Sequence, residues 1–79
     1  MDARTRARKL AAIRAGKCLF AEVLRGTVVV GPTAAVVPEA IVTVTQDSGA
    51  ASKVRIIVVL GKFSREGVDY ATAIFTRSR

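Results

Sequence analysis

The feature that most constrains the fold is a change of composition at Gly26. The first 25 residues are rich in Ala, Arg and Leu, which favour helix, and hold seven basic side chains against two acidic ones. Residues 26–79 hold 21 Val, Ile or Thr among 54, which favours strands. A chain of 79 residues without a linker is expected to form one domain, with a basic helical arm over 1–25 and a sheet over 26–79.

The apolar residues of the first part indicate an amphipathic helix. They recur at helical spacing and would form one narrow stripe: Leu10, Ile13, Phe20 and Leu24. Because glycine is unfavourable inside a helix, we expect the helix to stop or bend at Gly16. Residues 18–24 fit either a helical turn or a strand, since a short apolar run is compatible with both.

The second part alternates between strand patterns and turn residues. Strands are predicted over 27–30, 41–45, 53–60 and 68–76, with a weak continuation over 34–37 and turns at 46–49 and 64–67. Alternation in the run 53–60 predicts that one face holds Val54, Ile56, Val58 and Leu60, and that the other holds Lys53, Arg55, Ile57 and Val59. Both faces become apolar toward the end of the run, which predicts a central strand. The expected fold is α+β, a basic N-terminal helix followed by a four- or five-stranded antiparallel β-meander or small barrel.

The edges of this sheet are weakly protected. Soluble monomers usually guard edge strands with charge, proline or bulges, yet 27–30 carries no charge, 34–37 has only Pro38 beside it and 68–76 carries only Asp69. Either the strands close into a small barrel or another chain covers them. The core has four aromatic residues and consists mainly of Val and Ala, and small cores often need oligomerisation. We therefore predict a homo-oligomer or larger protein assembly, with a monomeric barrel as the alternative.

The reactive side chains argue against catalysis. Histidine is absent and Cys18 is the one cysteine, which excludes a histidine-based triad, a standard zinc site and an internal disulfide. Cys18 is interpreted as a small core hydrophobe, the alternatives being a reactive thiol or an intermolecular disulfide. Glu66 and Asp69 form the one close acidic pair, in a turn, and residues 61–64 lack the upstream glycine of a phosphate loop. We expect no enzymatic activity, no cofactor and no metal.

Positive charge is concentrated on the predicted helix. Six basic residues are candidates for contact with nucleic acid or an acidic partner: Arg4, Arg6, Arg8, Lys9, Arg14 and Lys17. On a helix, Arg6, Lys9 and Lys17 would lie along one side. The interpretations are a solvated face, a nucleic-acid contact directed at the phosphate backbone, or an acidic protein surface. Without aromatic residues this segment is not expected to stack on bases. An ordinary helix is favoured over a mitochondrial-type presequence, and no run is long enough to span a membrane.

Two stretches are similar to pieces of a known group. Residues 58–68 (VVLGKFSREGV) and 26–31 (GTVVVG) resemble the small head-decoration (cement) or minor capsid proteins of tailed bacteriophages, in which a buried strand ends in Gly-x-Phe. The match covers 17 of 79 residues. The resemblance implies a virion component in which Gly61 and Phe63 are structural positions.

These observations lead to one expected function and two alternatives. The expected function is a non-enzymatic structural subunit of a virion that assembles through its β-edges, with the basic helix on an acidic partner or nucleic acid. One alternative is a small cytoplasmic nucleic-acid-binding protein of the ribosome-associated or nucleoid type. The other is an inhibitor or adaptor that adds a strand to a partner sheet.

Overall fold

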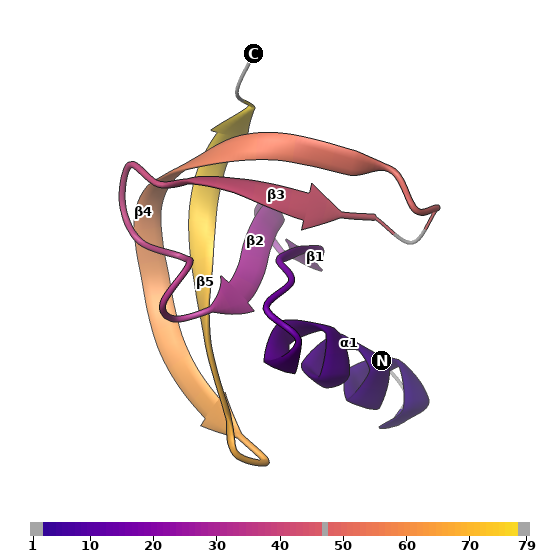
Figure 1. The fold of residues 1–79 in the computed structure, drawn as a ribbon. Coiled ribbons are helices and arrows are strands. Elements are labelled where there is room, and N and C mark those ends of the chain that lie inside the picture. Colours follow the sequence, from indigo (N-terminus) through magenta and orange to yellow (C-terminus); the bar gives the residue numbers. More distant parts are fainter. Residues whose placement is uncertain (1–2, 47, 78–79) are drawn as a thin grey trace.

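One helix is followed by five strands, which confirms the α+β class (Figure 1). The computed structural model describes residues 3–46 and 48–77. The elements within these residues are α1 (Ala3–Arg14), β1 (Leu19–Val23), β2 (Gly26–Pro32), β3 (Ile41–Thr45), β4 (Ala51–Arg65) and β5 (Val68–Arg77). Strands were expected close to four of these positions, but residues 34–37 lie in the connection between β2 and β3 and form no strand.

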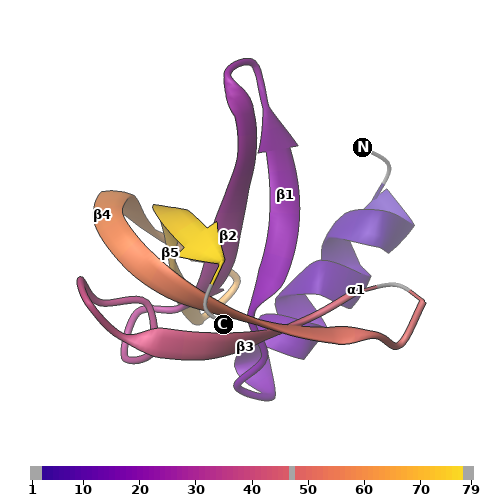
Figure 2. The ribbon, with the colours of Figure 1, turned by 90° about the horizontal axis from the view of Figure 1, so that it is seen from above.

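The five strands form one strongly curled sheet in the order β1-β2-β5-β4-β3, with antiparallel pairing throughout (Figures 1 and 2). Three pairs are hairpins, whereas β2 pairs with β5, so the order departs from a simple meander. The curl brings the two ends of the sheet together at one parallel bridge between Cys18 and Val44. There the Thr45 amide donates a hydrogen bond to the Cys18 carbonyl at 3.1 Å. The sheet is therefore a half-barrel joined at one point.

The edges of the sheet are not those expected from the charge pattern. Residues 27–30 lie in β2, between β1 and β5, and residues 68–76 lie in β5, the middle strand. The outer strands are β1 and β3. In addition, β3 pairs only with residues 51–55 of β4, so the rest of that long strand extends beyond it. The prediction of 27–30 and 68–76 as edges was wrong because an apolar pattern determines which face is buried, but not which strand is the neighbour.

The helix ends at a glycine in the left-handed conformation. Gly16 has φ of +93°, its amide bonds the Ile13 carbonyl at 2.9 Å, and the Lys17 amide bonds the Ala12 carbonyl at 3.0 Å. This is the Schellman arrangement that closes a helix. Residues 19–23 consequently form strand β1. The expected four-residue stripe is reduced to Leu10 and Ile13, since Phe20 lies in β1 and Leu24 is fully exposed in the following turn.

Two groups of apolar side chains lie on opposite faces of the sheet. Leu10 and Ile13 pack with Val68, and against the partly buried Leu19, Val30 and Tyr70, so α1 covers part of the outer face. The inner face holds the main core: Cys18, Val29, Val36, Val44, Val54, Ile56, Ala71 and Ala73. Val36 comes from the β2–β3 connection and is completely buried, so this connection supplies part of the core.

Two irregularities in β4 reverse its alternation. The register with β5 shifts between Ile56 and Val58 and again between Val59 and Gly61. A β-bulge inserts one residue and lets two successive side chains point to the same face. Ile56 is fully buried, whereas Val58 and Leu60 are about half exposed. The prediction that Val58 and Leu60 share one face with Val54 and Ile56 was therefore wrong.

In the turn between β4 and β5, Glu66 adopts a backbone conformation that is unfavourable for glutamate. Glu66 (φ +53°) and Gly67 (φ +77°) are both left-handed, as a two-residue type I′ hairpin turn requires. Because asparagine tolerates this region better than glutamate, Glu66→Asn should raise the free energy of unfolding by about 0.5–1 kcal/mol. Urea unfolding measures the change, and Asp69→Asn, which removes the same charge from a strand residue, is the control. Equal shifts in both variants would refute the conformational explanation.

Candidate functional site

Five exposed hydrophobic side chains gather on β4 and β5, and we call them the apolar strip: Ile57, Val58, Leu60, Phe63 and Ile74. One bulge inserts Ile57 and the other inserts Leu60. Because Ile56 and Val59 point to the inner face, the two inserted residues are left exposed on the outside. Val58 and Ile74 are direct cross-strand partners. The strip therefore belongs to the outer face of the half-barrel, beside the area that α1 covers.

Gly61 and Phe63, expected to be structural positions, lie together at this strip. The Phe63 ring lies over Gly61, 3.0 Å from where a Cβ atom of residue 61 would stand. The same ring stacks on Tyr70, with ring centroids 5.4 Å apart. Since Tyr70 also packs against the α1 cluster, Phe63 connects the covered part of the outer face to the uncovered part.

The backbone of β4 has an open side next to the strip. Beyond the β3 pairing, the Ile56 amide donates to the Ala40 carbonyl at 2.9 Å, and the Ile56 carbonyl accepts from the Glu39 amide at 2.8 Å. Within the described part of the chain, residues 57–65 pair only with β5. This segment is a strand edge with apolar side chains, interrupted by the bulges and flanked by Lys62 and Arg65.

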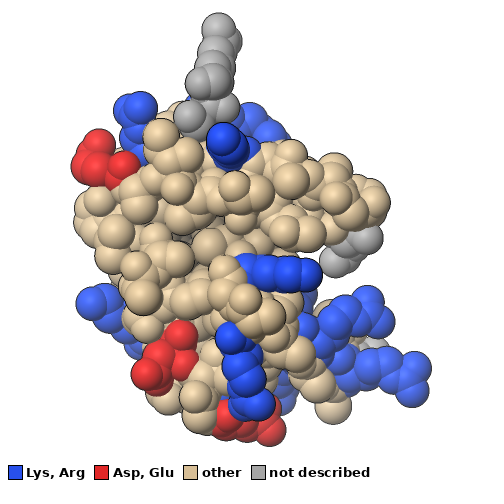
Figure 3. Space-filling model, in the orientation of Figure 1, with Lys and Arg blue, Asp and Glu red and all other residues tan. Residues whose placement is uncertain are grey.

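The basic residues surround a second feature, a groove between α1, β1 and the β3–β4 turn. We call it the basic groove; it has a volume of about 540 Å³ and is lined by Arg8, Lys9, Ala12, Lys17, Leu19, Phe20, Thr45, Gln46 and Ser48. Figure 3 shows Lys and Arg side chains gathered over and beside α1. None of the described residues that line the groove is acidic.

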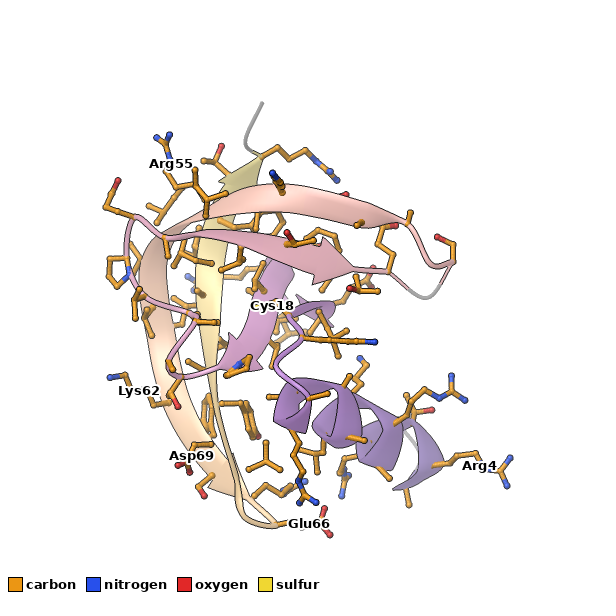
Figure 4. All side chains as sticks on the ribbon, in the orientation of Figure 1. Arg4, Cys18, Arg55, Lys62, Glu66 and Asp69 are labelled. Carbon is orange, nitrogen blue, oxygen red and sulfur yellow. The ribbon has the colours of Figure 1, made fainter. Side chains whose placement is uncertain are left out.

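The six basic residues that the sequence predicts as contact residues do not all lie in the same place. Arg8, Lys9 and Lys17 line the basic groove, and Arg6 lines an adjoining hollow. Arg4 projects from the far end of α1 (Figure 4). Arg14 donates a hydrogen bond to the Glu66 carbonyl at 3.0 Å and ties the helix to the β4–β5 turn. The sequence predicted that Lys17 lies on the same side of the helix as Arg6 and Lys9. This prediction was wrong, because α1 ends at Arg14.

The sheet supplies an aromatic side chain that sequence reasoning did not place in this site. Phe20 does not belong to a helical stripe: in β1 this half-buried residue lines the basic groove, packs against the main core and has its ring centroid 5.2 Å from that of Phe75. The ambiguity of residues 18–24 was the only signal for this position. Cations of α1 and an aromatic ring of the sheet therefore meet in one groove.

The single cysteine, Cys18, is explained by packing. Cys18 is buried in the core, and desolvation raises the pKa of its thiol, which disfavours the reactive thiolate.

Among residues 3–46 and 48–77 no three His, Cys, Asp or Glu side chains come close enough to hold a metal ion. No helix within these residues has the length and apolar character needed to cross a membrane. A comparison with protein-family models, curated proteins and solved structures found no match.

Proposed function

We propose that the protein is a non-enzymatic structural subunit that associates with further copies of itself through the apolar strip. The observation that carries the proposal is the exposure of five large hydrophobic side chains on one hairpin of a small chain, with Val58 and Ile74 paired across the strands. Clustered apolar exposure of this kind is typical of protein–protein contacts. The strip is also next to the open backbone of β4, so side-chain and backbone contacts can form together.

Two-fold symmetry allows a second copy to occupy the apolar strip. Arg55 lies at one end of the hairpin, and Glu66 and Asp69 lie at the other (Figure 4). Two copies related by a two-fold axis through the strip would run antiparallel, because such an interface uses the same patch on both chains. Arg55 of each copy would then approach the turn of the other, where Glu66 stands beside Arg65. The five residues of the strip carry no charge, so this contact buries apolar surface and leaves charged side chains at its rim.

The setting proposed for such a subunit is the virion of a tailed bacteriophage. This part of the proposal rests on the resemblance of residues 26–31 and 58–68 alone. These residues lie in β2 and in the β4–β5 hairpin, and the second stretch contains Val58, Leu60 and Phe63 of the apolar strip.

The experiment compares the mass of the purified chain in solution with that of two matched variants. Light scattering and native mass spectrometry at micromolar concentration should show a dimer or larger species for the unmodified chain. Val58→Lys/Ile74→Lys should be monomeric, because an unpaired buried charge at an interface centre costs several kcal/mol, on the order of a hundredfold or more in affinity.

The control is Val23→Lys/Leu24→Lys, which places the same two charges on exposed apolar residues of β1 and the β1–β2 turn. This variant should associate as the unmodified chain does. A monomeric unmodified chain, or equal dissociation of both variants, would overturn the proposal. Circular dichroism establishes that each variant retains its sheet.

A further inference from the structure

The basic groove is one of three hollows that Phe20 lines. The second, of about 220 Å³, also contains Lys9 and adds Arg6, Arg65 and Tyr70. The third, of about 440 Å³, adds Glu22, Phe75 and Arg77. Together their described lining residues include six cations, one carboxylate and three aromatic rings. This charge asymmetry attracts a polyanion.

The cations come from separate segments and converge by folding. Arg6, Arg8 and Lys9 belong to α1, Lys17 to the link that follows it, Arg65 to the end of β4 and Arg77 to the end of β5. The Schellman turn at Gly16 reverses the chain and sets Lys17 on the same groove as Lys9. Arg8 and Lys17 are exposed side chains, so their charges are available to a ligand.

We propose that the basic groove binds single-stranded nucleic acid, with Arg8, Lys9 and Lys17 on phosphate groups and the Phe20 ring as a platform for a base. Cationic grooves beside aromatic side chains are how proteins hold single strands without sequence preference. The hollow at Arg8 and Lys17, about 540 Å³, lies within the size range of small-ligand sites. Gln46 and Ser48 add polar groups on the opposite wall.

The aromatic ring favours a single strand over the other polyanions. A duplex keeps its bases stacked inside, so it would contact the cations but leave Phe20 without a partner. An acidic protein surface likewise offers carboxylates and no base. Because the groove lies on α1, β1 and the β3–β4 turn, it shares no residue with Val58 and Ile74, and the proposal does not depend on self-association.

The test measures binding of a fluorescent thymidine oligonucleotide of about 12 residues by anisotropy, between about 50 and 200 mM salt. The slope of log K against log salt is negative, and each phosphate contact on a single strand contributes about −0.7 to it. The double variant Arg8→Gln/Lys17→Gln should therefore make this slope less steep by about 1.4. The corresponding loss of affinity at about 0.1 M salt is about 25-fold.

The matched control is Arg25→Gln/Lys53→Gln, which also removes one arginine and one lysine. Neither residue lines any of the three hollows or belongs to the apolar strip. This control should change affinity less than threefold, on the order of the long-range effect of two screened charges. Equal losses in the two variants would show that only net charge attracts the strand, and would overturn the proposal.

Two further measurements distinguish the ligand. Phe20→Leu should weaken the oligonucleotide by about fivefold or more and leave the salt slope unchanged, because stacking involves no counterion. A glutamate peptide and inorganic polyphosphate of similar charge should bind more weakly than the oligonucleotide. Equal binding of the glutamate peptide, or no effect of Phe20→Leu in a variant that retains its sheet by circular dichroism, would refute a single-strand site. Neither outcome bears on the mass measured for the unmodified chain.

Discussion

Gly31→Ala should lower the free energy of unfolding by about 3 kcal/mol, the upper part of the range for overpacking a core. Gly31 is buried in β2, and a Cβ atom at this position would lie 2.5 Å from the sulfur of Cys18 and 3.1 Å from a methyl carbon of Val36. Both neighbours are buried in the same core, so neither can move into solvent. Gly31→Val adds two further methyl groups and should cost more than Gly31→Ala, which is a large share of the about 4–12 kcal/mol of stability expected for a domain of this size.

The control for Gly31→Ala is Gly61→Ala, another glycine in a strand. A Cβ atom there would approach the tip of the Phe63 ring at 3.0 Å, but this ring is about half exposed and can rotate outward. The loss should stay below about 1 kcal/mol, as for most surface substitutions. Similar losses at both positions would show that glycine is required for the backbone of the strand and not for space.

A double-mutant cycle identifies the atom responsible. Cys18→Ala removes the sulfur that stands closest to Gly31, so Gly31→Ala should be much less harmful in this background. The coupling energy should be about 1–2 kcal/mol, within the range for residues in direct contact. Urea unfolding of the four proteins measures it, and additive losses would contradict the packing explanation.

The sequence predicted the class of fold because local signals agree with the final structure. The predicted strand over 41–45 coincides with β3, and Gly16 ends the helix as its position suggested. The alternation of Tyr70, Thr72 and Ile74 against Ala71 and Ala73 also matches the faces of β5. These features depend on residues within a few positions of one another, which a pattern can show.

The strand order could not be predicted, because it depends on contacts between distant segments. β2 pairs with β5 across a gap of more than 35 residues, and nothing in either segment marks the other as its neighbour. The same limitation hid the basic groove. The cations of α1 were visible in the sequence, but the groove exists only because Phe20, Thr45 and Gln46 are brought opposite them. The interpretation of Phe20 as part of a helical stripe removed the one aromatic residue that belongs to the site.

The bulges in β4 present the same difficulty at the scale of two residues. Ile56 and Ile57 are adjacent and chemically identical, and a regular strand would place them on opposite faces whichever one is buried. The structure shows that Ile56 is inaccessible to solvent and that 44% of Ile57 is exposed. Because Val58 is exposed as well, the bulge, and not alternation, determines which side chains form the apolar strip.

Ile56→Ala should therefore cost about 3–4 kcal/mol, because it removes three buried carbon atoms and leaves a cavity between Val54, Ala73 and their neighbours in the core. Val58→Ala should cost less than about 1 kcal/mol, because about half of this side chain is exposed to water, whereas a regular strand would bury it beside Ile56. Both changes are made in the Ile74→Lys background, so that the proposed association does not contribute, and unfolding is followed in urea. Equal costs would mean that the bulge is absent in solution and that β4 keeps a regular register with β5. In that case the apolar strip would lose its structural basis, because Val58 would return to the face that Ile56 occupies.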